Sequence, residues 1–398
     1  MQKKNRKRVK SALVKIAAGL IAVLVSPPLA AFVGGNSGVF VSLWEDEITA
    51  YEEREYGLSS SAILEMSSSA LLLYKPAEHG IEIIPQRIPP ADQDMYSNSF
   101  WSDGIAAGDT PAAAQVLSLN ITEVREEPLN FTMVDGRIVK LTYGPNVGFI
   151  NLALAGQVRN ETELDRDFVL AQSRKPPEIK LELNGEPEVL IMHTHTTEAF
   201  QPCGFDFFDA SYYGRSLDSD KNIVAVGAEM AKSFAEAGIT VIHDGTVHDY
   251  PVFNGAYARS QQTVQQVLEA YPSIKIVLDV HRDAIETGDG SRVAPVTQVD
   301  GHDAAQVMII SAADDGTWDI PYYLHNFRLA SLFQQHMEHD YPGITRPVLF
   351  QYSQYNQHLT PGSLLIEIGT HGNTLEEAKY TGTLIGRSMA EALLSLVD

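Results

Sequence analysis

The stretch Val189-Leu-Ile-Met-His-Thr-His-Thr-Thr-Glu198 is the strongest indication of the fold in the second half of the chain, because a polar run directly follows four apolar residues. Such an apolar run is typical of a strand that is buried on both faces of a sheet. Further apolar runs at 239–242, 274–280, 307–310 and 364–368 alternate with longer amphipathic segments. The alternation predicts an α/β fold with a mostly parallel, twisted sheet and helices on both faces.

Four helices are expected around these strands. Apolar residues recur at helical spacing from Ile223 to Phe234, and Gly238 is suited to end that helix. The other three are expected near residues 256–271, 324–340 and 375–396, the last with the capping-box spacing of Thr374 and Glu377. Residues 286–303 interrupt the alternation and predict a loop or hairpin over one sheet edge.

Polar residues that can bind metal follow three of the predicted strands. They are His193, His195 and Glu198 after the first strand, His281 at the end of the third, and Glu367 inside the last. Because the carboxyl ends of parallel strands line the ligand crevice of an open α/β sheet, these side chains can share one site. The sequence therefore predicts a functional site at this edge.

Zinc fits these residue types, because two imidazoles and one carboxylate leave a position open for water. Either His193 or His195 can be the first ligand, with Glu198 and His281 as the others. A buried carboxylate such as Glu367 costs several kcal/mol without a partner or a task. A suitable task is to take a proton from attacking water and deliver it to a leaving nitrogen.

Two further groups allow more than one interpretation. Arg282 and Asp283 are candidate substrate contacts, or they form an ion-pair cluster with Asp279 that braces the loop. Cys203 is a candidate thiol nucleophile, but the sequence shows no arranged histidine partner for it. As the single cysteine, it excludes an intrachain disulfide and a structural cysteine zinc cluster.

The composition narrows the classes of protein. The chain has 398 residues, 44% of them hydrophobic, which is enough for one large or two medium globular domains. Its formal net charge of −22 argues against a nucleic-acid binder, which needs a basic face to neutralise phosphates.

The amino terminus is typical of an export segment. Six basic residues lie within the first ten positions, and an apolar stretch runs from Ile16 to Val33. The stretch fits either a single membrane anchor or a cleaved signal peptide, and we favour the anchor, with everything after it outside the cytoplasm. We expect a cytoplasmic tail at 1–10, the membrane segment at 11–33, a partly β-structured region at 34–186 and an α/β catalytic domain at 187–398.

Three motifs carry a family resemblance. His193-Thr-His-Thr-Thr-Glu198-Ala-Phe, Leu278-Asp-Val-His281-Arg-Asp283 and Leu365-Ile-Glu367-Ile-Gly369 resemble the stage II sporulation protein P family, membrane-anchored cell-wall hydrolases of endospore-forming bacteria. The segments Asn254-Gly-Ala-Tyr-Ala-Arg259-Ser260 and Asn373-Thr-Leu-Glu-Glu377 also fit. The resemblance covers 187–398 well, whereas 37–180 agrees only in general layout.

The resemblance implies a fold and an activity. It implies a domain similar to zinc-dependent N-acetylmuramoyl-L-alanine amidases, with zinc at His193 or His195, Glu198 and His281, and with Glu367 catalytic. The implied reaction is cleavage of peptidoglycan between muramic acid and the stem peptide, with endopeptidase activity on cross-links as an addition. The implied partners are stage II sporulation proteins D and M, in the intermembrane space of the developing spore during engulfment.

Two other functions remain open from the sequence. One is a barrel-type metal amidohydrolase, whose first strand ends in a His-x-His pair, but the residues after Pro187 fall short of the roughly 250 of a full barrel. The other is a non-catalytic scaffold that binds the wall or a partner with a degenerate metal site.

Overall fold

The computed structural model describes residues 114–121, 135–209, 212 and 214–397, all within one compact unit, Ile83–Asp398. The expected tail and membrane segment at 1–33 lie outside these residues. Within the part that is described, no helix is both long and apolar enough to cross a bilayer.

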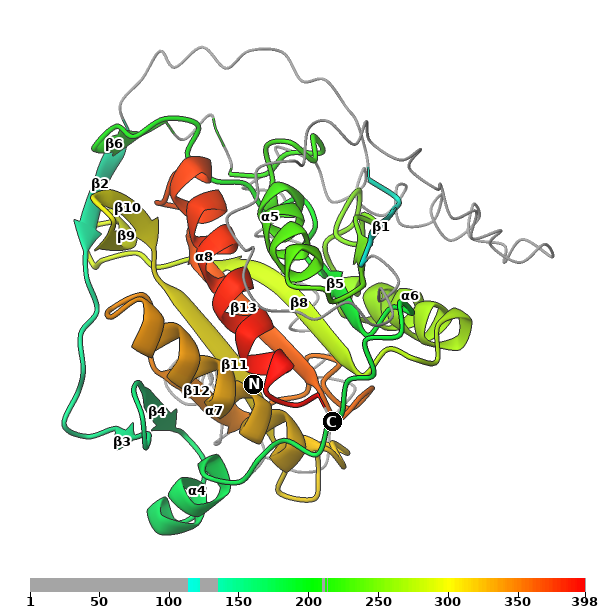
Figure 1. Cartoon of the computed structure of the whole chain (residues 1–398). Coiled ribbons are helices and arrows are strands. Elements are labelled where there is room, and N and C mark those ends of the chain that lie inside the picture. Colours follow the sequence, from blue (N-terminus) through cyan, green and yellow to red (C-terminus); the bar gives the residue numbers. More distant parts are fainter. Residues whose placement is uncertain (1–113, 122–134, 210–211, 213, 398) are drawn as a thin grey trace, which may run out of the picture. The chain divides into compact units, whose positions relative to one another are not determined.

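Thirteen strands and five helices are present among the described residues (Figure 1). The strands are β1 (Val116–Leu119), β2 (Gly136–Leu141), β3 (Ile150–Asn151), β4 (Gln157–Asn160), β5 (Val189–Met192), β6 (Phe207–Phe208), β7 (Val241–Asp244), β8 (Ile276–Asp283), β9 (Arg292–Val299), β10 (His302–Ala305), β11 (Val307–Ala313), β12 (Val348–Tyr352) and β13 (Ser363–Thr370). The helices are α4 (Arg166–Ser173), α5 (Ile223–Glu236), α6 (Ala256–Ala270), α7 (Tyr323–Asp340) and α8 (Leu375–Leu394).

Nine of these strands form one large sheet in the order β1-β7-β5-β8-β13-β11-β12-β4-β3. Neighbouring strands are parallel except at β13–β11 and β4–β3. The mixed but mostly parallel sheet confirms the expected α/β class. The five buried apolar runs of the sequence became β5, β7, β8, β11 and β13, each within a few residues of its expected bounds.

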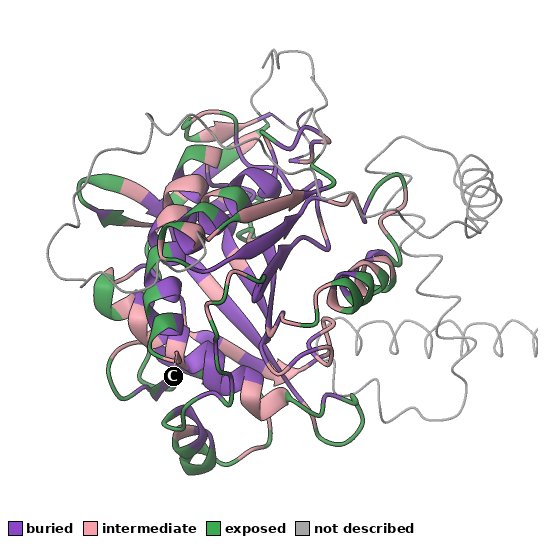
Figure 2. Cartoon of the chain, turned by 45° about the vertical axis from the view of Figure 1, so that its right-hand side comes forward, coloured by how far each residue is buried: buried purple, intermediate pink, exposed green. Residues whose placement is uncertain are grey.

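The helices cover both faces of the large sheet. On one face α5, α7 and α8 pack over the main core, which contains Met230, Phe327 and Met389. On the other face α6 places Val264 and Val267 against the sheet in a second cluster. Figure 2 shows buried residues along the central strands and on the helix faces turned towards them. Thr374 and Glu377 form the predicted capping box of α8.

The described residues before Pro187 contribute strands to both sheets. β1 pairs with β7 at one edge of the large sheet, and β4 pairs with β12 near the other. β2 pairs with the hairpin β9–β10 in a second, four-stranded sheet, which is the hairpin expected at 286–303. The physical reason is edge protection, because added strands pair the backbone groups that an edge leaves open.

Candidate active site

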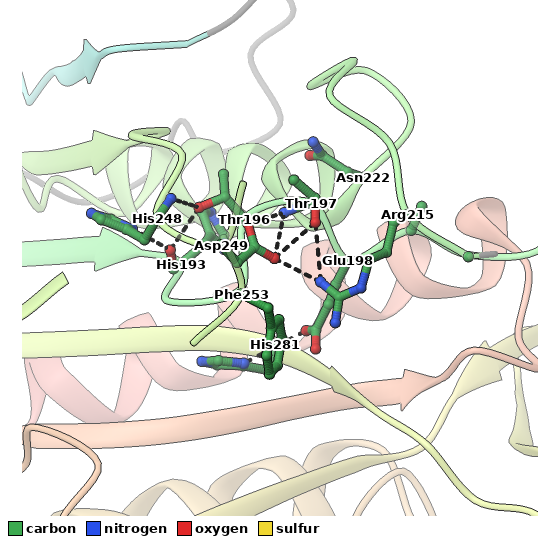
Figure 3. Close-up of polar contacts among 12 residues, drawn as sticks. His193, Thr196, Thr197, Glu198, Arg215, Asn222, His248, Asp249, Phe253 and His281 are labelled. Carbon is green, nitrogen blue, oxygen red and sulfur yellow. Dashed lines mark hydrogen bonds and ion pairs between the residues drawn. The ribbon is translucent and has the colours of Figure 1, made fainter. Parts of the chain in front are cut away.

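Three neighbouring parallel strands bring the expected residues together. β5, β8 and β13 lie side by side, and His281 of β8 is directly opposite Glu367 of β13 in the register. The pairing becomes irregular immediately after Glu367, a feature that is frequent beside active sites. The turn after β5 carries His195 and Glu198 to the same end of the sheet, as Figure 3 shows for Glu198 and His281.

Both ring nitrogens of His193 are already used inside the protein. Nδ1 lies 2.8 Å from the carbonyl oxygen of Val280, and Nε2 lies 3.0 Å from Nε2 of His243. His193 is completely buried, and burial lowers its pKa to about 4, so the ring is neutral. With one nitrogen donating to Val280 and the other accepting from His243, the ring has no free lone pair for a metal.

Gly227 of α5 makes this histidine pair possible. A Cβ atom at this position would lie 2.7 Å from His193 Nε2 and 2.8 Å from His243 Nε2. We expect Gly227→Ala to lower the free energy of unfolding by about 1–3 kcal/mol, because neither buried ring has room to move. Urea unfolding measures the change, with Gly288→Ala as the control, since a Cβ there meets nothing within 4 Å. A Gly227→Ala protein as stable as the wild type would contradict this packing.

His195, unlike His193, has a ring nitrogen without a hydrogen-bond partner, the buried Nδ1. Its ring stacks on Phe253 with centroids 4.5 Å apart, and it meets His281 edge-on at 5.2 Å. Burial lowers the pKa of His195 against the opposing charge of Glu198, which favours the neutral ring. A neutral imidazole with an unpaired buried nitrogen can bind a metal ion.

Glu198 and His281 form the centre of the cluster. Glu198 Oε2 lies 3.5 Å from His281 Nδ1 and accepts a hydrogen bond from the backbone N–H of Arg282 at 3.0 Å. Burial alone would raise the pKa of Glu198, but the contacts with His281 and the charge of Arg282 outweigh it and lower the pKa. The carboxyl group is therefore ionised.

Asp279 holds the other side of the His281 ring. His281 Nε2 lies 2.8 Å from Asp279 Oδ1, and the same carboxylate accepts hydrogen bonds from the backbone N–H and the hydroxyl of Thr194. Burial opposes a charged His281, but Asp279 and Glu198 together raise its pKa well above the usual value. A carboxylate on Nε2 leaves Nδ1 directed at Glu198, and such carboxylates commonly orient histidines that bind metals.

Glu367 is a half-buried carboxyl group opposite His281 in the neighbouring strand. Its Oε2 atom is buried without a hydrogen-bond partner. Burial raises the pKa of Glu367 to about 8, and the charges of Asp283 and Glu198 add to the rise. A carboxyl group with a pKa near neutrality can both take up and release a proton.

The donor set fits zinc in residue type. Among the described residues, no group of three or more His, Cys, Asp or Glu side chains is placed so that it could hold a metal ion. The His195 ring, whose Nδ1 is unpaired, nevertheless lies 5.2 Å from the His281 ring, and His281 Nδ1 and Glu198 Oε2 are 3.5 Å apart. That separation suits two ligands of one tetrahedral zinc ion, which binds nitrogen and carboxylate oxygen at about 2.0–2.2 Å.

Arg282 and Asp283 lie beside this cluster. The Arg282 guanidinium is buried and donates to the carbonyl oxygens of Ala199 at 3.0 Å and Gly214 at 2.9 Å, which ties two loops together. Asp283 forms an ion pair with Arg346 at 2.7 Å. The substrate contact expected for Arg282 and Asp283 stays a prediction.

The surroundings of Cys203 do not favour a nucleophilic thiol. The side chain is half-buried, and burial raises the pKa of its thiol. A nucleophilic cysteine needs a lowered pKa, so this environment does not activate the thiol.

Three aromatic residues complete the surroundings of the cluster and were not expected there. Phe253 and Tyr257 contact the His195 ring, and Tyr355 contacts Tyr257. Tyr257 lies in the segment 254–260 that resembles the family, but the resemblance implied no role for it. Tyr355 follows β12 in a turn that no local sequence signal connects with the site.

A family model and one curated relative match this chain. The model described as stage II sporulation protein P matches residues 154–390. Stage II sporulation protein P of Bacillus subtilis strain 168 is 24% identical over 229 residues, which are 55% of this chain and 54% of that protein. The chain thus matches about half the length of this curated relative.

Solved structures give weaker matches. The N-acetylmuramoyl-L-alanine amidase AmiC2 of Nostoc punctiforme is 12% identical, with a TM-score of 0.31 over 53% of this chain and 97% of that chain. The CwlD amidase from Clostridioides difficile, solved with the GerS lipoprotein, is 12% identical, with a TM-score of 0.32 over 52% and 98%. These similarities are weak and indicate nothing about activity.

The family match includes every residue of the cluster, namely His195, Glu198, His281 and Glu367. It also includes β4, which precedes Pro187. It extends over more than half of the sequence, and we conclude that the chain belongs to the stage II sporulation protein P family.

Proposed function

We propose that this protein is a zinc-dependent peptidoglycan hydrolase of sporulation, which cuts the amide bond between muramic acid and the first residue of the stem peptide. The observation that carries the proposal is the cluster of His195, Glu198 and His281 beside Glu367 at the carboxyl ends of three parallel strands. Family membership supports a role in sporulation.

The ligands in this proposal are His195 Nδ1, Glu198 and His281 Nδ1. His195 is preferred to His193 because both nitrogens of His193 are engaged by Val280 and His243. Zinc bound there would supply Lewis acidity to polarise the scissile carbonyl and lower the pKa of water. Asp279 keeps the His281 ring oriented for this task.

Glu367 moves the proton in this proposal. Its Oε2 atom accepts the proton of the attacking water and later donates it to the nitrogen of the departing stem peptide. The buried, unpartnered oxygen and a pKa of about 8 support both halves of this exchange near neutral pH. An endopeptidase activity on cross-links would use the same groups on another amide.

Membrane attachment would bring the enzyme to its substrate. The net charge of −22 gives no long-range attraction to an anionic wall. An amino-terminal anchor with the catalytic domain outside the cytoplasm raises the local concentration of substrate instead. Stage II sporulation proteins D and M are the proposed partners at this membrane.

Removal of metal tests the proposal. We expect 1,10-phenanthroline to abolish release of soluble fragments from purified peptidoglycan by the full-length chain, and added zinc to restore it, because the ligands are nitrogen and carboxylate donors. Dye release from labelled peptidoglycan measures the activity, and magnesium in place of zinc is the control. Unchanged release after chelation would contradict the metal site. A zinc-loaded chain that binds peptidoglycan without cutting it, even with protein D present, would indicate a scaffold.

A further inference from the structure

One tyrosine ring lies over the ligand cluster, and a second tyrosine ring packs against it. Tyr257 of α6 stacks above His281 with centroids 6.4 Å apart, and it meets the His195 ring edge-on at 5.6 Å. Tyr355 packs against Tyr257 with centroids 5.6 Å apart. The two phenols therefore come from distant parts of the sequence to one place beside the proposed ligands.

The turn that carries Tyr355 is strained. Tyr355 has a φ of +46° and Asn356 a φ of +55°, so two successive residues other than glycine adopt the left-handed region. Such a conformation is unfavourable for a residue other than glycine, and it persists only where surrounding contacts hold it, most often at functional sites.

Hydrogen bonds from Asn356 hold the turn against α6. Its Nδ2 donates to the carbonyl oxygen of Tyr257 at 2.9 Å and to the hydroxyl of Ser260 at 3.0 Å. The Ser260 and Thr194 hydroxyl oxygens are hydrogen-bonded at 2.7 Å, and Thr194 donates its own proton to Asp279 behind His281. The turn is thus tied to Tyr257 on one side and to the network that orients His281 on the other.

Both phenols keep an unused hydrogen-bond donor. Gln351 Nε2 donates to the Tyr355 oxygen at 3.5 Å, but within the described part of the chain neither tyrosine O–H donates to an acceptor. An unperturbed tyrosine hydroxyl has a pKa of about 10. Both hydroxyls are therefore protonated at neutral pH.

We infer that Tyr257 and Tyr355 form a pair of phenol donors that binds the carbonyl oxygen of the scissile amide and stabilises it as it becomes an oxyanion. This inference rests on the proposed function. The phenols keep their protons throughout, so no bond to them forms or breaks. An uncharged hydrogen-bond donor is suitable beside Glu367, because a lysine or arginine there would pair with that carboxylate and lower its pKa.

Conservative substitutions test the pair. In the full-length chain, we expect Tyr355→Phe and Tyr257→Phe each to lower kcat by about 100-fold, the usual loss of one oxyanion donor. KM for a soluble glycan–stem-peptide fragment should change by less than about threefold, because the bond strengthens only in the transition state. Tyr380→Phe is the matched control, since that hydroxyl donates to Val299 away from the site. Thermal unfolding and zinc content are measured for all variants and should be unchanged.

The outcomes separate this inference from the proposed function. A wild-type chain that releases no stem peptide would overturn the proposed function, and this inference with it. An active wild type whose tyrosine variants keep kcat within threefold would overturn only the phenol pair. A raised KM with unchanged kcat would also overturn it, because the tyrosines would then bind ground state and transition state equally.

Discussion

Glu367→Gln is expected to lower kcat for stem-peptide release by about 10²–10⁴-fold, because an amide cannot take up the proton of the attacking water. The substitution keeps the size and shape of the side chain, so β13 and its pairing with His281 should be preserved. The buried Oε2 atom has no hydrogen-bond partner to lose. Hydrolysis of a soluble fragment measures the loss, and circular dichroism and zinc content check the fold and the metal.

Glu229→Gln is the matched control for this change. That carboxylate lies on α5 and forms a partly exposed ion pair with Lys379 at 3.4 Å, so its loss should leave kcat unchanged. A Glu367→Gln protein with full activity would contradict the proton-transfer role. Loss of zinc in the same variant would make Glu367 a ligand instead and overturn our assignment of roles.

We expect His195→Ala mainly to weaken zinc binding and His193→Ala mainly to lower stability. We expect the zinc affinity of His195→Ala to fall by more than the roughly 10–100-fold that follows removal of a residue that only orients a ligand. The chain should stay folded. His193→Ala should lower the free energy of unfolding by about 1–3 kcal/mol, because His243 is left buried without its partner. Its zinc affinity should fall less than that of His195→Ala.

Zinc titration and urea unfolding of the two variants measure this contrast. His302→Ala is a suitable control, because that histidine is exposed on β10 in the second sheet. The assignment of His195 would be contradicted if His193→Ala stayed as stable as the wild type and lost zinc while His195→Ala kept it.

The sequence predicted the large sheet and its helices because both leave strong local patterns. β5, β8 and β13 are buried on both faces, so their apolar runs are nearly continuous, and α8 begins at a capping box that the sequence displays. The polar residues at the ends of these strands could be placed at one edge by the general rule for parallel sheets. β12 was missed, because its five residues are only partly apolar and give no clear period.

Tertiary contacts decided the features that the sequence left open. The motif His-Thr-His offers two equivalent imidazoles, and only the contacts with Val280 and His243 distinguish His193 from His195. β1 and β2 each join a sheet through a partner strand more than a hundred residues away, which no local signal indicates. The same holds for Tyr355, which reaches the site through a strained turn held by Asn356.

Mass spectrometry of the products that the zinc-loaded, full-length chain releases from peptidoglycan identifies the bond that is cut. We expect free stem peptides, each with a new amino group on its first residue, beside intact glycan strands. Cut cross-links with stems still attached to muramic acid, cut glycan strands, or no soluble product in the presence of proteins D and M would contradict it.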